Sequence, residues 1–212
     1  SASRGVGLTI GEGLDLFEPD GLRYALAANL PEQSDTDISV EEIARRINEE
    51  LAATWGNLVN RVLSMVHKTC DGQVPEPGDR QPEDIALLAT IDASLITAGQ
   101  QLEKVELRAA LRTGMDGAAA VNAYLNATEP WKVAKDDPER AKVILGTALA
   151  AVGGVRVALA PYLPFSTKTL NDPFGPVAGW QREELTPGSP IGKPSPLFAK
   201  VDLGELLADQ ES

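Results

Sequence analysis

The chain has 212 residues, of which 43% are hydrophobic, a composition and length that suffice for one packed core. We find no apolar run close to the ~20 residues that a membrane span needs, and no signal peptide in SASRGVGLTI, so we expect a cytoplasmic protein. A single cysteine, Cys70, and a single histidine, His67, exclude an internal disulfide and a metal site built on several such residues. The net charge of −12, taken alone, argues against a nucleic-acid partner, but residues 54–175 are nearly balanced, so an anionic partner is expected to meet that part of the chain.

The N-terminal part predicts two short helices, within TIGEGLDLF and EPDGLRYALAANL, the second beginning at Pro19. A long helix is predicted over residues 39–70, with Ser39 as its N-cap and Glu42 reaching back to complete a capping box. Its apolar residues recur every three or four positions, as on the buried face of a helix: Val40, Ile43, Ile47, Leu51, Trp55, Leu58, Val62 and Val66. A strand signal is weak throughout, being limited to VGLTI and LFAKV.

Three more helices are predicted by the same periodicity, over residues 81–111, 114–127 and 138–160. The first of them includes Ile85 and Val105 among its apolar positions, and the second restarts after Gly114. The polar segment NATEPWKVAKDD is predicted to be a loop. Asp137 then caps the last helix, which begins with proline.

These elements predict an all-α protein built as an antiparallel helix bundle. We expect a connective segment over residues 1–38, the bundle over residues 39–170, and an irregular C-terminal tail over residues 171–212 that packs back on the bundle. The tail prediction depends on its many proline and glycine residues, which break helices.

Residues that could carry catalysis are scarce. The sequence contains no glycine-rich phosphate loop of the GxxxxGK type. Adjacent carboxylates, such as the pairs at residues 41–42 and 49–50, are typical of a solvated helix face. We interpret His67 as a surface or boundary residue of its helix and Cys70 as inert packing.

Recognition is a better-supported interpretation than catalysis. Asn57 and Arg61 are four residues apart in GNLVNR, so they project from the same side of the long helix, roughly 100° to 140° from the centre of its apolar stripe. Asparagine and arginine suit the edges of unpaired bases, and Trp131, in the polar segment, suits stacking on one. The competing interpretations are an Asn57 and Arg61 that only solvate the helix and a Trp131 that packs beneath its loop.

Over almost its whole length the chain resembles the C-terminal half of methionyl-tRNA synthetases. INEELAATWGNLVNRVLSMVHKTCDGQVPEP resembles the first long helix of their anticodon-binding bundle, and NAYLNATEPWKVAKDDPERAK resembles the loop and helix that complete the anticodon site. SPIGKPSPLFAKVD resembles their C-terminal peptide. The resemblance implies a pocket for the CAU anticodon of tRNA, formed by Asn57, Arg61, Pro130 and Trp131, with a base stacked on the tryptophan.

The resemblance also defines what is missing. The chain begins inside the mobile loop usually written KMSKS, with Ser1, Ala2 and Ser3 in place of its last three residues, and a lysine that helps hold ATP phosphates aligns with Ala2. Either Ser1 and Ala2 are left over from a cloning tag, or this protein has lost that lysine. The catalytic domain, with its HIGH-type motif and zinc-binding insert, does not occur in the sequence. The chain alone is therefore expected to be inactive, with ATP, and zinc in some members, bound only by that domain.

Three functions stay open at this point. The chain is an anticodon-binding part of a methionyl-tRNA synthetase, or a stand-alone paralogue that binds tRNA without catalysis or serves as a subunit of a split enzyme. The third alternative is a helical module for protein–protein interaction, for which the net charge of −12 is the only support. Retention of the pocket residues favours tRNA as the partner. We expect a monomer that binds neither DNA nor a membrane.

Overall fold

The structure is a computed structural model that describes residues 8–30, 38–204 and 206. Within these residues the regular structure is helical, and the only pairing of the β type is an isolated bridge between Gln73 and Pro190. The all-α prediction is confirmed. Neither weak strand signal produces a strand in the described region: LFAKV is irregular, and VGLTI lies partly outside it.

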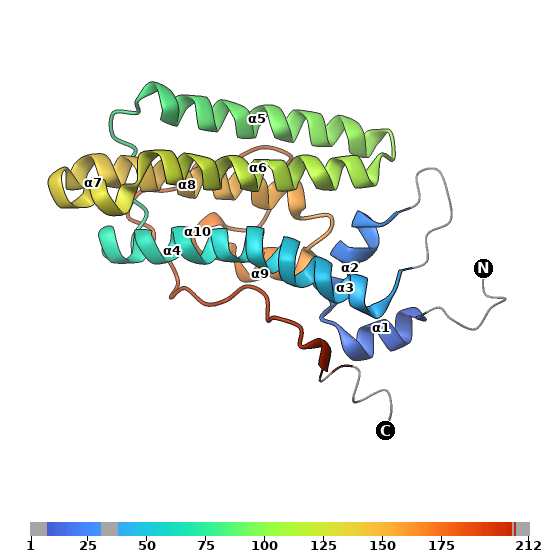
Figure 1. The fold of residues 1–212 in the computed structure, drawn as a ribbon. Helices are drawn as coiled ribbons and strands as arrows, with labels where there is room; N and C mark the ends of the chain where they lie inside the picture. Colours follow the sequence, from blue (N-terminus) through green and yellow to red (C-terminus); the bar gives the residue numbers. More distant parts are fainter. Residues whose placement is uncertain (1–7, 31–37, 205, 207–212) are drawn as a thin grey trace.

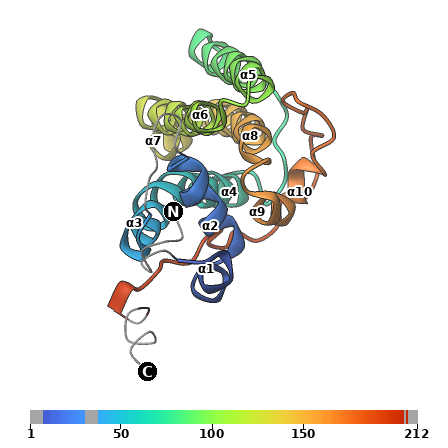
Figure 2. The ribbon, with the colours of Figure 1, turned by 90° about the vertical axis from the view of Figure 1, so that its right-hand side faces the viewer.

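Four long helices form the bundle: α4 (Asn57–Thr69), α5 (Pro82–Glu103), α6 (Leu107–Thr128) and α8 (Pro138–Leu159). Successive helices run in opposite directions along one axis, as Figure 1 shows, and the end-on view of Figure 2 shows α6 between α5 and α4. The central helix is α8, which is buried along most of its length because it packs against α4, α5 and α6.

Two described helices, α5 and α8, are long and apolar enough to cross a membrane by length and composition alone. The sequence-based expectation that no segment approaches a membrane span was therefore too strict. The core helix of a folded domain passes the same test, and α8 is mostly buried inside the bundle. Its apolar composition is accounted for by that burial.

The long helix predicted over residues 39–70 is confirmed in extent, but its middle part is a π-helix and not an α-helix. It consists of α3 (Val40–Arg45), an eleven-residue π-helix η1 (Arg46–Gly56), and α4. Ser39 caps its start, with the backbone N–H of Glu42 donating to the serine hydroxyl at 3.2 Å. The other half of the predicted capping box is wrong, because the Glu42 carboxylate pairs instead with the guanidinium groups of Arg45 and Arg46.

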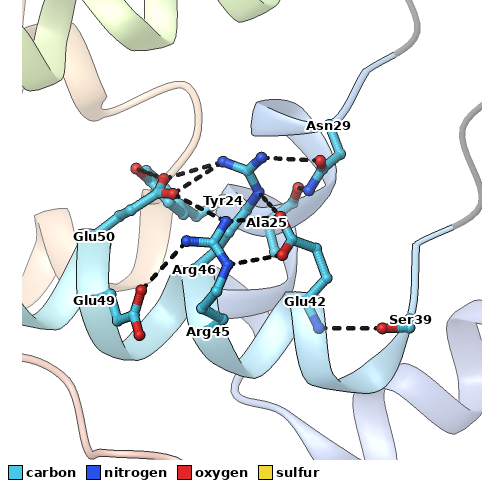
Figure 3. Close-up of polar contacts among 9 residues, drawn as sticks. All are labelled: Tyr24, Ala25, Asn29, Ser39, Glu42, Arg45, Arg46, Glu49 and Glu50. Atoms are coloured by element: carbon cyan, nitrogen blue, oxygen red, sulfur yellow. Dashed lines mark hydrogen bonds and ion pairs between the residues drawn. The ribbon is translucent and has the colours of Figure 1, made fainter.

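A polar network joins η1 to α2 (Pro19–Ala28), as Figure 3 shows. Arg46 donates to the Glu50 carboxylate at 3.1 Å and to the side-chain oxygen of Asn29 at 3.0 Å. The hydroxyl of Tyr24 donates to Glu50 at 3.1 Å, and burial raises the pKa of Tyr24 above its usual range, so the proton stays in place. The carboxylates at positions 42 and 50 are therefore partners of arginines rather than a purely solvated face.

The N-terminal segment forms α1 (Ile10–Leu16) and α2, as predicted, with α2 beginning at Pro19. A second hydrophobic cluster packs this segment against the start of the long helix; its buried members are Phe17, Leu22, Ala25, Ile43, Ala44 and Ile47. Tail residues Val201, Leu203 and Leu206 pack on the same cluster.

Asp20 and Arg23 dock α2 onto the end of the bundle. The buried Asp20 carboxylate accepts hydrogen bonds from the backbone N–H and the hydroxyl of Ser166, both at 2.6 Å, in the first turn of α9 (Pro164–Thr169). Arg23 donates to the carbonyl oxygens of Pro161 at 2.8 Å and Tyr162 at 3.1 Å. These contacts fix the connective segment to the bundle at the end opposite α7, as Figure 1 shows.

The boundary between the second and third bundle helices was placed wrongly. The break falls at residues 104–106, where Val105 adopts a φ of +62° and its side chain is 73% exposed. Gly114, the predicted breaker, lies inside α6, where an added Cβ would come within 2.8 Å of the Leu159 side chain on α8. The glycine therefore allows close packing between two helices, and Ile85, predicted to face the core, is exposed on the outside of α5.

The residues after α9 form a short helix, α10 (Asn171–Phe174), and then an irregular tail. The tail packs back on the bundle, because the indole N–H of Trp180 donates to the carbonyl oxygen of Leu95 at 2.7 Å and the Arg182 guanidinium pairs with Asp92 at 3.0 Å. Further along, the side chain of Asn48 makes two 2.8 Å hydrogen bonds with the backbone N–H and carbonyl of Val201.

Candidate nucleic-acid interface

Trp131 lies on a short helix and not in a loop. α6 ends at Thr128, Glu129 takes a left-handed conformation with a φ of 43°, and α7 (Pro130–Asp136) begins at once. The backbone N–H groups of Lys132 and Val133 donate to the carbonyl oxygen of Glu129 and close the first turn of α7. The loop prediction for this segment was wrong, because a proline in the first position of a helix starts a helix as readily as it ends one.

The Trp131 side chain is exposed at the start of α7, with 43% of its surface accessible, whereas the preceding Pro130 is buried. A tryptophan that packed beneath its own turn would be covered, so that alternative is not supported. Pro130 packs into the bundle and holds the turn in place, and the Trp131 indole beside it is exposed to solvent. α7 stands at the end of the bundle farthest from α1, as Figure 1 shows.

Arg61 lies on α4 and its side chain reaches across to α6. One guanidinium nitrogen, Nη2, donates to the side-chain oxygen of Asn122 at 3.0 Å, and the other, Nη1, donates to that of Asn126 at 3.4 Å. The third nitrogen, Nε, is buried without a hydrogen-bond partner, and burial lowers the pKa of the arginine. The side chain is thus only partly solvated and is held by neutral acceptors.

The expected site residues lie on α4 and α7, and the side chain of Arg61 reaches α6, the helix that precedes α7. Arg61 is tied to the last two turns of α6, the helix that leads directly into Pro130 and Trp131. Asn57 is exposed one turn before Arg61 on α4, and within the described chain no hydrogen bond joins it to Trp131. Ser1, Ala2 and Ser3 lie outside the described residues.

Comparison with family models covers most of the chain. The model described as tRNA synthetases class I (M) matches residues 1–63, and that of the anticodon binding domain of methionyl tRNA ligase matches residues 74–209. The chain belongs to the methionyl-tRNA ligase family. The resemblance inferred from sequence motifs is confirmed.

Individual methionyl-tRNA ligases agree with this assignment. The Corynebacterium urealyticum enzyme is 37% identical over 95% of this chain and 40% of its own length, and that of Beutenbergia cavernae is 38% identical over 100% and 39%. The crystal structure of the apo form of Mycobacterium tuberculosis methionyl-tRNA synthetase gives a TM-score of 0.78 at 31% identity, covering 86% of this chain and 39% of that one. The chain thus spans about two-fifths of the length of the curated relatives it matches.

A buried ionic brace, which sequence reasoning missed, supports α7 in this member of the methionyl-tRNA ligase family. Asp84, near the start of α5, accepts hydrogen bonds from the Tyr124 hydroxyl at 2.5 Å and from Nη2 of Arg140 at 2.9 Å, while Nη1 of Arg140 forms a further ion pair with it. Tyr124 lies near the end of α6 and Arg140 in the first turn of α8. The brace therefore fixes the end of α6 and the start of α8, and α7 is the segment that connects them.

The sequence gives only a weak indication of this buried ionic brace. Asp84 is the acidic partner of a capping box with Gln81, so its place in the first turn of α5 looks like ordinary helix capping. Burial alone would raise the pKa of Asp84, but the hydrogen bonds from Arg140, Tyr124 and the Gln81 backbone outweigh it and lower that pKa. The carboxylate is therefore charged in the folded protein.

The remaining polar residues singled out earlier are distributed without forming a second site. Within the described residues no group of three or more histidine, cysteine or acidic side chains is arranged to hold a metal ion. His67 is exposed on α4, and Cys70 is buried just after it, where burial raises the pKa of the thiol to about 11. A thiol with that pKa is unreactive at neutral pH, in agreement with its interpretation as packing.

Proposed function

We propose that this chain recognises the CAU anticodon of methionine tRNA, as the anticodon-binding part of a methionyl-tRNA ligase. The observation that carries the proposal is the exposed indole of Trp131 at the start of α7, 43% accessible on a turn that Pro130 anchors in the bundle. The match of the anticodon-binding family model to residues 74–209 supports the same assignment.

The proposed site divides its tasks among three kinds of contact. The indole offers a flat apolar surface on which an unpaired base stacks, a contact worth about 1 to 3 kcal/mol. The Arg61 guanidinium supplies a fixed fork of donors for carbonyl or phosphate oxygens, and the exposed Asn57 amide can donate to and accept from a base edge. Stacking supplies affinity for any base, so the amide and guanidinium contacts provide the selectivity.

We further propose that the chain by itself neither activates methionine nor charges tRNA. The chain matches only 40% and 39% of the length of two relatives. The family resemblance implies that ATP, and zinc where a member binds it, is held by the catalytic domain, whose motifs do not occur in this sequence, and that the ATP-phosphate lysine of the KMSKS loop aligns with Ala2. Purified chain is expected to show no methionine-dependent exchange between ATP and pyrophosphate, and measurable exchange would refute this part of the proposal.

Binding of dye-labelled anticodon stem-loops, followed by fluorescence anisotropy, tests the recognition proposal. The chain is expected to bind a CAU stem-loop more tightly than one with another anticodon, and Trp131→Ala is expected to weaken CAU binding about 5- to 150-fold, the equivalent of one stacked base. Helicity should be unchanged, because Trp131 does not belong to the buried core of the bundle.

Trp180 provides a matched control. Its side chain is similarly accessible, at 38%, but its indole N–H is bonded to the Leu95 carbonyl, and the residue belongs to the tail. Trp180→Phe should lower the melting temperature and leave stem-loop binding unchanged. Equal affinity for CAU and other stem-loops, or a Trp131→Ala protein that binds like the unaltered chain, would contradict the assignment.

A further inference from the structure

Arg61 is held by side-chain amides, whereas four other arginines of the described chain pair with carboxylates, and Arg23 and Arg156 donate to backbone carbonyl oxygens. The guanidinium groups of Arg45, Arg46, Arg140 and Arg182 all face carboxylates. That of Arg61 faces two neutral amide oxygens, and among the described residues no carboxylate lies within ion-pairing distance of it.

The contacts around Asn122 fix which end of its amide meets the arginine. The amide nitrogen donates to the carbonyl oxygen of Ala118 one turn earlier on α6, at 3.3 Å, so the amide oxygen is directed to the guanidinium. Asn126 stands one turn later on the same face of α6 and receives the second guanidinium nitrogen. Two side chains on one helix therefore set the orientation of a cation on another.

An amide and a carboxylate would both align the guanidinium, but they differ in what they leave for a ligand. A carboxylate neutralises the arginine and places a negative charge where RNA must approach, whereas an amide aligns it and leaves its positive charge intact. The burial that lowers the pKa of Arg61, and its unpartnered Nε, are the costs of keeping this charge without an ionic partner.

We propose that Asn122 and Asn126 are positioning residues that hold the Arg61 guanidinium as an uncompensated cation for an oxygen acceptor of the anticodon loop. This inference rests on the proposed function. The acceptor is a phosphate oxygen or a base carbonyl oxygen, and the two can be told apart. Loss of a phosphate contact weakens binding equally for all anticodons, whereas loss of a base contact weakens it for CAU alone.

Asn122→Asp is the decisive variant, because it changes the charge of the acceptor with almost no change in shape. We expect the 212-residue chain carrying it to melt at the same temperature or higher, since Arg61 gains an ion pair. We also expect its affinity for the CAU stem-loop to fall at least tenfold, and the slope of log affinity against log salt to become shallower by about one. Asn126→Asp should act in the same direction but less strongly, because its contact is longer at 3.4 Å.

Asn60→Asp is the matched control for added negative charge. Asn60 is the neighbour of Arg61 on α4, and its side-chain oxygen accepts from the Ser64 hydroxyl at 3.3 Å. It should bind the stem-loop within about twofold of the unaltered chain. Asn122→Ala, which removes the acceptor without adding charge, should reduce affinity less than Asn122→Asp and should differ less from the unaltered chain in salt dependence.

The outcomes separate this inference from the function on which it rests. Failure of Trp131→Ala to weaken binding counts against the proposed function itself. If Trp131→Ala and Arg61→Ala both weaken binding but Asn122→Asp does not, the proposed function stands and the positioning role is overturned. The role is also overturned if Asn122→Asp loses binding only in parallel with melting temperature, or if Asn60→Asp loses as much affinity.

Discussion

Replacing Asp84 by asparagine removes the charge from the centre of the brace that joins α5, α6 and α8. The carboxylate is fully buried and accepts from Tyr124 at 2.5 Å, from Arg140 at 2.9 Å and from the Gln81 backbone at 2.8 Å. Breaking a buried ion pair by removing one partner costs about 3 to 5 kcal/mol, because the other charge is left buried. Since 1 kcal/mol shifts the melting temperature of a chain of this size by about 2 to 4 °C, we expect a fall of about 6 to 20 °C.

The expected fall depends on pH. The folded-state pKa of Asp84 is lowered from its ordinary value of 3.8, so the stabilisation is fully present above that value and is lost as the pH falls through the lower folded-state pKa. Asparagine carries no titrating proton. The difference in melting temperature between the unaltered chain and Asp84→Asn should therefore be large at pH 7 and shrink below about pH 4.

Asp92→Asn supplies the control for this experiment. Asp92 also pairs with an arginine through two hydrogen bonds, both at 3.0 Å, but its side chain is 46% exposed. An ion pair so accessible to water contributes about 0 to 1 kcal/mol. Melting followed by circular dichroism at pH 7 and at low pH compares the two variants. Equal shifts for both, or a shift for Asp84→Asn that does not change with pH, would refute the reasoning.

Two further predictions concern the bundle itself. Leu58→Ala should lower the free energy of unfolding by about 2 to 5 kcal/mol in chemical denaturation, because Leu58 is fully buried. Ile85→Ala, at an exposed position of α5, should change it by less than about 0.5 kcal/mol. Similar losses for the two variants would contradict the assigned core. Val105→Gly should raise the free energy of unfolding by about 1 kcal/mol, because Val105 is exposed and holds a positive φ that glycine adopts without strain; a lower melting temperature would contradict this.

Local patterns in the sequence were enough to find most of the helices. The apolar spacing of residues 39–70 identified one long helix, and Ser39 and Asp137 were recognised as caps that the structure confirms. Each of these signals depends on residues within one or two turns of each other, so the sequence contains all the necessary information. The position of Trp131 on a helix was missed because its polar segment was predicted to be a loop, although Pro130 stands at a position where helices begin.

The end of α5 shows where such signals fail. The backbone N–H groups of Val105 and Glu106 donate to the carbonyl oxygens of Leu102 and Gln101, which is the usual left-handed termination of a helix. Glycine is the residue that normally marks this turn, but here a valine occupies it, and a glycine nine residues later is helical. Packing against Leu159 on α8 decides the role of Gly114, and local propensity does not.

The polar contacts around the candidate site were decided by the tertiary structure alone. Arg61 and Asn122 are 61 residues apart, and Asp84 is separated from Tyr124 by 40 residues and from Arg140 by 56. No periodicity or capping rule links positions so far apart, because their proximity depends on how the helices pack and in which order. The sequence by itself determined the helices, their apolar faces and, through family motifs, the residues proposed to meet the anticodon. Helix packing determined that Arg61 donates to the amides of Asn122 and Asn126 and that Arg140 pairs with the Asp84 carboxylate. Residues so far apart in the chain contact each other only because burial of apolar faces brings their helices together.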